Sequence, residues 1–231
     1  MIEKVEDTLN GGYGGLYGEV VTCDTYKLLE LNFIPDLIFD IGANVGIFAR
    51  YARTLFPDAE IIAVEPDSDN LQNLRKFTFD SKLRIIEAAL GVGPVYRVAG
   101  AVNGAHEAYF TKGLGYPKSD PPHPHYQPSL ATAVTLAQIV KSTGWQGRKT
   151  FLKLDCEGGE NSIWQDEESM MFLRMMDAVS IELHYHAAYG GPVHEEVKRV
   201  TDNALASLAA THQCEKDGCH FHARKCTTLK T

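Results

Sequence analysis

The sequence lacks any long apolar segment. No stretch of it approaches the roughly 18 consecutive apolar residues that a membrane-spanning helix needs. Its first ten residues, MIEKVEDTLN, contain no apolar core of the kind that secretory signals carry. These absences lead us to expect a soluble, cytoplasmic protein with no membrane partner.

The sequence also lacks any cluster of basic residues. It contains 22 Lys and Arg residues against 30 Asp and Glu residues, which gives a formal net charge of -8. Domains that bind nucleic acids usually carry a basic patch or stripe, so nucleic acid is not the expected partner. A small molecule, a glycan or a protein surface fits this charge better, and the sequence indicates no oligomeric state.

Cysteine is scarce, and its spacing is not that of a metal site. The chain has five cysteines, an odd number, so we expect free thiols rather than a disulfide framework. The Cys and His residues near the end of the chain are His212, Cys214, Cys219, His220, His222 and Cys226. No CxxC or HxxxH pair occurs there, and a hairpin turning at residues 216–218 would place Cys219 and His220 on opposite faces. Structural zinc is therefore not expected.

Short apolar runs alternate with helical patterns along most of the chain. The strands expected from these runs lie near residues 36–40, 60–65, 83–88, 150–155 and 178–183. This alternation predicts an α/β fold with a doubly wound, mostly parallel sheet. With 231 residues, of which 44% are hydrophobic, the chain can bury one good-sized core, so we expect a single domain over residues 1–231.

Three segments depart from the alternation. Residues 1–34 carry glycines interleaved with tyrosines, too glycine-rich for a helix or a central strand, and form either a cap over a ligand site or a disordered leader. Residues 100–130 combine histidines, tyrosines and prolines, which indicates a lid or a solvated insertion. Residues 192–210 predict an amphipathic helix, and a C-terminal antiparallel hairpin is expected to follow it at the sheet edge.

A ligand site is indicated by residues 37–46, LIFDIGANVG, in which an apolar run ends at Asp40 and passes into a glycine-rich turn. Gly42 and Gly46 allow unusual dihedral angles and let a ligand approach without meeting a Cβ atom. Dinucleotide-binding folds carry GxGxxG, but Asn44 stands at the place of the second glycine, which disfavours a pyrophosphate. Asp40 suits a cationic group. The pattern therefore favours S-adenosylmethionine, which carries an ammonium and a sulfonium group.

The next apolar run, residues 61–64, ends at Glu65. An acidic residue at this position is the usual partner of ribose hydroxyls. A lone glutamate at a strand end is more often simply solvated, but its separation from the glycine-rich turn favours the binding role. Asp67 or Ser68 is expected to cap the helix that follows.

A third motif, FLKLDCEGGE at residues 151–160, ends a strand at Asp155 and places Glu157 directly before two glycines. Ligands of open α/β sheets bind outside the carboxyl ends of the strands. Both carboxylates should therefore face the reaction crevice.

Together these motifs resemble the FkbM-type methyltransferases. The resemblance rests on DIGANVGIFA, AVEPDSDNLQNL and FLKLDCEGGE, with support from ALG at 89–91 and TLAQIV at 135–140, and runs over roughly residues 35–185. It implies the Rossmann-like class I methyltransferase fold, S-adenosylmethionine as cofactor, and methylation of a hydroxyl group, often on a sugar or a natural product. Cys156 and Gly159 depart from the family's more usual aliphatic residue and alanine, and residues 100–130 are unusual, which leaves the acceptor open.

Methylation of an alcohol requires that donor and acceptor are aligned, that water is excluded and that the hydroxyl proton is removed. The last parallel strand, AVSIELHYH, brings Glu182, His184 and His186 to the same edge and the same side. His184 is our first choice for the base and His186 the second. Asp155 and Glu157 are the other catalytic candidates. The residues that could instead hold a divalent cation are Asp155, Glu157, Glu182 and His184, although we favour a metal-free network.

The motifs and the resemblance imply a set of cofactor-binding residues around the strand ends. These are Asp40, Gly42, Ala43, Asn44, Gly46, Glu65, Pro66, Glu87, Ala88 and Asp155. Two alternatives to methyl transfer remain open. A nicotinamide-dependent oxidoreductase would use Glu65 but lacks the glycine at Asn44, and a non-catalytic S-adenosylmethionine-binding module would have no use for His184. The leading hypothesis is an S-adenosylmethionine-dependent O-methyltransferase that acts on a small molecule or a glycan.

Overall fold

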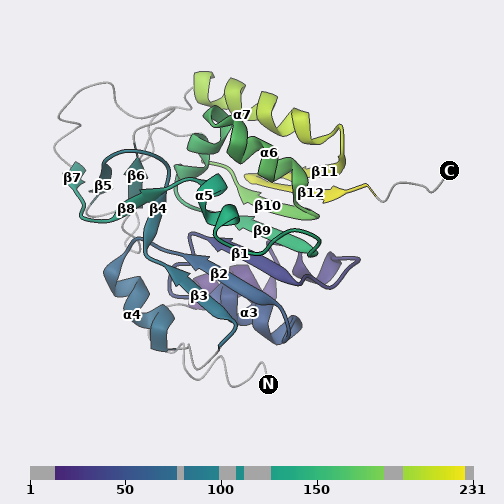
Figure 1. Ribbon diagram of the computed structural model, residues 1–231, viewed down its shortest axis with the longest axis horizontal. Coiled ribbons are helices and arrows are strands. Elements are labelled where there is room, and N and C mark those ends of the chain that lie inside the picture. Colours follow the sequence, from purple (N-terminus) through teal and green to yellow (C-terminus); the bar gives the residue numbers. More distant parts are fainter. Residues whose placement is uncertain (1–13, 77–80, 99–107, 112–125, 185–194, 227–231) are drawn as a thin grey trace.

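A computed structural model describes residues 14–76, 81–98, 108–111, 126–184 and 195–226. Its centre is a seven-stranded sheet with the strand order β11-β12-β10-β9-β1-β2-β3 (Figure 1). Chain connections cross from one half of the sheet to the other between β3 and β9, so the carboxyl ends of β1 and β9 flank the switch point at which ligands of such sheets bind.

Five neighbouring strands of this sheet are parallel. They are β1 (Leu37–Ile41), β2 (Glu60–Val64), β3 (Leu83–Ile86), β9 (Thr150–Leu154) and β10 (Ala178–Glu182). All residues of β1 and β9 are buried, as expected for strands covered on both faces. The predicted doubly wound, mostly parallel sheet is therefore confirmed, with strand bounds within a few residues of those expected.

The C-terminal hairpin is also confirmed. It consists of β11 (His212–Asp217) and β12 (His220–Lys225), and β12 runs antiparallel to β10. Gly218, with φ of 57°, and Cys219 form the two-residue connection. This turn is one residue later than predicted, because the left-handed conformation that such tight turns need is supplied by Gly218.

Helices cover the two faces of the sheet. On one side lie α3 (Ile47–Leu55) and α4 (Ser68–Lys76). The other side is covered by α5 (Leu136–Lys141), the 3-10 helix η3 (Gly159–Gln165), α6 (Glu167–Met175) and α7 (Glu195–Leu208) (Figure 1). The two groups of helices pack against alternate residues of β1. Ile38 belongs to the hydrophobic core on the side of α3, and Leu37, Phe39 and Ile41 belong to the core on the opposite side.

Some of the helices begin where the sequence supplies side-chain acceptors for their first amides. Asp67 accepts hydrogen bonds from the backbone N–H groups of Asp69 and Asn70, as predicted for α4. Thr135 and Gln138 form a reciprocal capping box at the start of α5. The longest helix in the described ranges, α7, confirms the predicted amphipathic helix over residues 195–208. No helix in these ranges is long and apolar enough to cross a membrane.

The glycine-rich N-terminal segment contains helical turns, so the expectation that it avoids helix is wrong. A short helix α2 (Gly14–Tyr17) leads into a π-helix η1 (Gly18–Thr22), and a 3-10 helix η2 (Leu28–Glu30) follows. The segment is held by burial of Val20, Tyr26 and Leu28 against α3. Tertiary packing of these side chains outweighs the low helix propensity of glycine.

Short strands lie around residues 100–130, the segment that the sequence predicts to be irregular, and two of them, β6 (Ala108–Thr111) and β7 (Tyr126–Pro128), lie inside it. β4 (Ala88–Leu90) pairs with β8 (Thr132–Val134), and β5 (Val95–Val98) pairs with β6 and β7. The rest of the predicted lid, residues 99–107 and 112–125, lies outside the described residues. All five cysteines are described and carry free thiols, as expected.

Candidate active site

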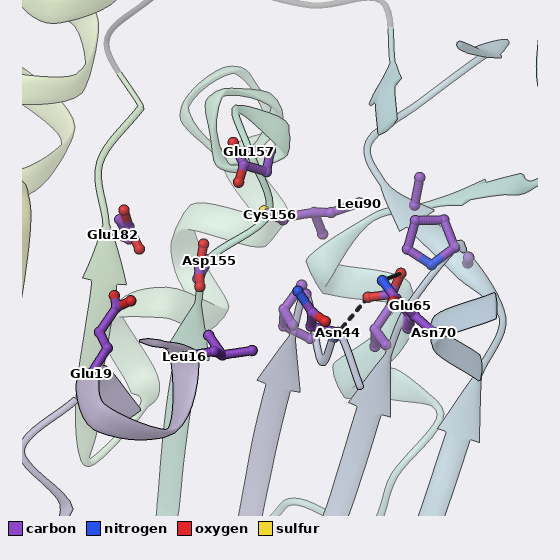
Figure 2. A pocket seen from close by; sticks show the side chains of 16 residues that line it. Leu16, Glu19, Asn44, Glu65, Asn70, Leu90, Asp155, Cys156, Glu157 and Glu182 are labelled. Carbon is purple, nitrogen blue, oxygen red and sulfur yellow. Dashed lines mark hydrogen bonds between the residues drawn. The ribbon is translucent and has the colours of Figure 1, made fainter. Parts of the chain in front are cut away.

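A cavity of about 250 Å³ opens at the carboxyl ends of the parallel strands (Figure 2). One end of it is apolar, with walls that include Ile41, Val64 and Leu90. Leu16 and Glu19 of the N-terminal segment also line it, which places part of the predicted cap region at the cavity. The cavity therefore lies where the sequence predicts the ligand site.

Glu65 lies in the wall of the cavity with a side chain held from several directions. Its Oε2 accepts a hydrogen bond from the backbone N–H of Asn44 at 2.8 Å, and its Oε1 accepts from the backbone N–H of Asp67 at 2.9 Å and from the Asn70 amide at 3.3 Å (Figure 2). Burial raises the pKa of Glu65, while the hydrogen bonds from Asp67 and Asn44 lower it. Oε1 thus accepts two hydrogen bonds, and Oε2, which accepts one, keeps a lone pair for a ligand hydroxyl.

Gly42 lines the cavity, and the packing of the backbone around it requires a glycine at this position. A Cβ atom at this position, where φ is 79°, would lie 1.7 Å from the backbone oxygen of Asp155. The turn after β1 and the end of β9 therefore pass too closely for any side chain. At Gly46 a Cβ atom would meet Cδ1 of Leu74 in α4 at 2.6 Å, which a shift of the leucine side chain can relieve. The expected unusual dihedral angles are confirmed, with φ of 79° at Gly42 and 89° at Gly46, and close packing at Gly42 is a further reason for glycine there.

This geometry predicts a sharp difference between two glycines with the same backbone conformation. Gly42→Ala should lower the free energy of unfolding by about 1–3 kcal/mol more than Gly93→Ala, because forced overpacking typically costs that much. Gly93 has φ of 80°, but a Cβ atom added there would meet nothing within 4 Å, so it controls for dihedral strain. Urea denaturation of both variants measures the difference, and equal midpoints would contradict the close approach.

Several residues predicted to bind the cofactor do not face the cavity. Asp40 is fully buried below it, and Ala43 is 2% exposed without lining it. Gly46 packs against Leu74 of α4. The carboxylate of Glu87 points to the surface, where it pairs with Arg75. The predicted residues that do line the cavity are Gly42, Asn44, Glu65, Pro66, Ala88 and Asp155.

Asp40 instead belongs to a buried network under the cavity floor. Its Oδ1 lies 3.2 Å from Nζ of Lys153, which also donates a hydrogen bond to the Gly42 carbonyl at 2.5 Å and lies 3.7 Å from Oδ2 of Asp155. Burial raises the pKa of Asp40 against the lowering charge of Lys153. Burial lowers the pKa of Lys153, but the charges of Asp40 and Asp155 raise it above the ordinary value. Asp40 thus forms a buried ion pair and does not line the cavity.

Tyr26 ties the N-terminal segment to this network. Its hydroxyl donates a 2.6 Å hydrogen bond to Oδ2 of Asp155, and Lys153 lies over its ring at 5.4 Å. Burial works to raise the pKa of Asp155, but Lys153, His184 and the Tyr26 hydrogen bond lower it overall. Asp155 is therefore an ionised carboxylate at the cavity. Sequence reasoning missed Tyr26, because nothing in its local pattern marks it as a partner of a residue so distant in sequence.

The other end of the cavity is acidic. Asp155, Glu157, Glu182 and Glu19 all line it, and they come from the end of β9, the turn after it, β10 and η1 (Figure 2). Burial and the charges of Glu182 and Asp155 raise the pKa of Glu19. Four carboxylates around one cavity favour a cationic ligand group.

His184 is held at this acidic end by Glu160, a residue that sequence reasoning overlooked. Oε1 of Glu160 accepts hydrogen bonds from the backbone N–H and from Nδ1 of His184, both at 2.9 Å. Glu160 is 1% exposed, and its Oε2 accepts from the Gly158 N–H. The signal was available, since Glu160 closes the third motif as a carboxylate at the start of a buried helical turn.

The surroundings of His184 do not favour the role of general base, which requires an unprotonated imidazole before the reaction. Burial lowers its pKa, but the charge and hydrogen bond of Glu160, together with Asp155 and Glu157, raise it well above the ordinary value. A raised pKa leaves less of the neutral imidazole that a base needs. His186, the second choice, lies outside the described residues.

Ligand atoms of Asp155, Glu157 and His184 lie within 4.8 Å of one another, a spacing that is compatible with the metal site left open by the sequence. Each of the three has a protein partner, because Asp155 accepts from Tyr26, His184 is held by Glu160, and Glu157 lies 3.7 Å from His184. The metal-free network stays our prediction for these residues.

Comparison with known proteins gives one family match. The model of the methyltransferase FkbM domain matches residues 40–205. A methyltransferase, sdnD of Sordaria araneosa, is 39% identical over 51 residues, which are 22% of this chain and 19% of that protein. The chain thus matches about a fifth of the length of this curated relative.

Solved structures with a similar arrangement are methyltransferases of low identity. A putative caffeoyl-CoA O-methyltransferase from Staphylococcus aureus is 10% identical with a TM-score of 0.49, over 96% of this chain and 97% of that one. The magnesium protoporphyrin IX methyltransferase from Synechocystis PCC 6803 is 9% identical with a TM-score of 0.47, over 91% and 80% of the two chains.

Proposed function

Because the chain belongs to the FkbM methyltransferase family, we propose that it transfers a methyl group from S-adenosylmethionine to a hydroxyl group of a small molecule or a sugar. The observation that carries the proposal is one cavity with the Glu65 acceptor in one wall and four carboxylates at its other end. Because the match is to a methyltransferase family, we no longer consider a nicotinamide-dependent oxidoreductase as the alternative function.

The residues around the cavity fit this cofactor. Glu65 would accept a hydrogen bond from a ribose hydroxyl, and the apolar wall at Val64, Ala89 and Leu90 would contact the adenine. Asp155, which is ionised, suits the ammonium group of the methionine part. When bound, the cofactor supplies an electrophilic methyl group on a sulfonium.

Glu157 is the residue that we assign as base. Asp155 is committed to Tyr26 and Lys153, and Glu182 lies between His184 and His220. Glu157, by contrast, has a side chain that is 55% exposed at the cavity and contacts His184 only at 3.7 Å. Its φ of 52° is rare for a residue other than glycine, and such strain is concentrated at functional sites. It would take the hydroxyl proton as the oxygen attacks the methyl group.

A two-stage experiment tests the proposal. Calorimetry with S-adenosylmethionine and with NADH comes first, and only S-adenosylmethionine should bind. Hydroxylated metabolites and sugars are then screened with the full chain and the cofactor for a mass gain of one methyl group. Binding of NADH alone, or methyl transfer only to amines, would overturn the assignment. Cofactor binding without transfer to any compound class would favour the non-catalytic binding module.

Cofactor affinity should depend on Glu65 and not on Glu87. Glu65→Ala should weaken S-adenosylmethionine binding by about 1–3 kcal/mol, or roughly 5- to 150-fold, because hydrogen bonds to a charged acceptor are lost in a buried wall. Glu87→Ala is the matched control, since its carboxylate pairs with Arg75 at the surface. Circular dichroism confirms that both variants fold, and calorimetry gives the affinities. Equal affinity in the two variants would remove Glu65 from the cofactor site.

A further inference from the structure

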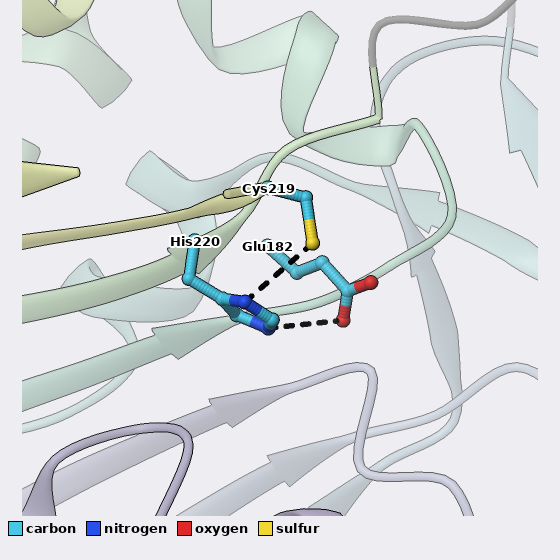
Figure 3. A group of neighbouring side chains, drawn as sticks. All are labelled: Glu182, Cys219 and His220. Atoms are coloured by element: carbon cyan, nitrogen blue, oxygen red, sulfur yellow. Dashed lines mark hydrogen bonds and ion pairs between the residues drawn. The ribbon is translucent and has the colours of Figure 1, made fainter. Parts of the chain in front are cut away.

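The hairpin brings Cys219 and His220 together with Glu182 of β10 (Figure 3). In the antiparallel pairing of β10 and β12, Glu182 lies directly opposite His220, so their side chains share one face of the sheet. Cys219 belongs to the turn and not to the strand, so strand alternation does not apply to it. The expectation that Cys219 and His220 point to opposite faces is therefore wrong.

The three side chains lie close enough together to contribute ligands to one ion. Sγ of Cys219 lies 3.5 Å from Nδ1 of His220, and Oε2 of Glu182 lies 3.7 Å from the other ring nitrogen, Nε2. One ion would bind only one of these nitrogens, so the Cys219 or the Glu182 side chain must shift toward the nitrogen that the ion uses. Tetrahedral zinc, with bonds of about 2.0–2.3 Å, separates its nitrogen and oxygen ligands by about 3.4 Å and sulfur from nitrogen by about 3.6 Å. One ligand atom from each residue lies within 4.8 Å of the others, so small side-chain rotations bring them to one centre.

One atom of the cluster is buried without a hydrogen bond. Nε2 of His220 makes none within the described part of the chain, and Oε2 of Glu182 is too distant to accept one. The ring is held in place by its stacking on His222 at 6.4 Å and by an edge contact with Tyr26 at 6.2 Å. A buried nitrogen that is fixed in position and left unsatisfied is costly, and a bound cation would satisfy it.

We propose that Glu182, Cys219 and His220 form a Zn²⁺ site. Thiolate, imidazole and carboxylate are the donors that zinc accepts together, whereas Mg²⁺ and Ca²⁺ prefer oxygen alone. Three protein ligands leave the fourth position open, which is the arrangement of reactive rather than purely structural zinc sites. Because Glu182 and Glu19 also line the cavity, the open position lies beside the acidic end of the active site.

The site does not depend on the methyl-transfer proposal, since metal content is measured without cofactor or acceptor. The full chain is stripped with a chelator, dialysed and titrated with Zn²⁺ against a chromophoric chelator, and bound metal is counted by mass spectrometry. We expect one zinc ion per chain. Cys219→Ser and His220→Gln should each weaken binding by roughly 100-fold or more, since even the outer partners of metal ligands cost 10–100-fold.

Cys226→Ser is the matched control, because Cys226 is an exposed cysteine of the same segment outside the cluster, and it should bind zinc as the unaltered chain does. Substitution with Co²⁺ gives a second readout, a thiolate charge-transfer absorption that Cys219→Ser should abolish while Cys226→Ser keeps it. Thermal unfolding shows that each variant folds. Absence of stoichiometric zinc, or zinc that survives Cys219→Ser and is lost in Asp155→Asn, would overturn the site.

Discussion

Lys153→Met should lower the free energy of unfolding by about 3–5 kcal/mol, the usual cost of leaving one partner of a buried ion pair uncompensated. The side chains of Lys153 and Asp40 are 4% and 0% exposed, and their charged atoms are 3.2 Å apart. Methionine keeps an unbranched apolar side chain close in length to that of lysine but cannot neutralise Asp40 or donate to the Gly42 carbonyl. The turn that forms the cavity floor would lose its anchor together with the ion pair.

Lys82→Met provides the comparison for this prediction. Lys82 pairs with Asp58 at the surface, where both side chains are well exposed, so its loss should cost no more than about 1 kcal/mol. The double variant Lys153→Met with Asp40→Asn removes both charges and should recover part of the loss. Chemical denaturation of the three variants gives the free energies. A cost for Lys153→Met as small as that for Lys82→Met would show that the pair does not stabilise the fold.

The fold was accessible from the sequence because its strands are nearly continuous apolar runs that end at chemically distinct residues. Burial of Leu37, Phe39 and Ile41 on one face and Ile38 on the other needs only local alternation. The hairpin followed from one glycine, Gly218, between two extended segments. In the N-terminal segment, local propensity opposed the structure, and packing of Val20 and Tyr26 against α3 decided the outcome.

The site was predicted only in part, because several of its roles depend on pairing between distant strands. Asp40 has the sequence position of a ligand contact, but the register of β1 and β9 places Lys153 opposite it. Glu160 and Tyr26 were missed, since their partners His184 and Asp155 come from other elements. The expected separation of Cys219 and His220 rests on a rule for strands that does not hold in a turn.

The catalytic step should depend more on Glu157 than on His184. Glu157→Gln keeps the size of the side chain but cannot accept a proton, so turnover should fall by roughly 10² to 10⁴, the range of general-base contributions. His184→Gln should cause a smaller loss, because this residue lies 3.7 Å from Glu157 as a charged neighbour held by Glu160. Turnover is measured on the acceptor that the mass-shift screen identifies.

Cofactor affinity separates the chemical effect from the binding effect in these variants. The cofactor's ribose and ammonium groups are assigned to Glu65 and Asp155, which neither variant alters, so both variants should bind S-adenosylmethionine about as tightly as the unaltered chain. A larger loss of turnover in His184→Gln than in Glu157→Gln would restore His184 as the base, and the ring would then have to lose its proton on substrate binding. Equal and full activity in both variants would show that neither Glu157 nor His184 removes the proton.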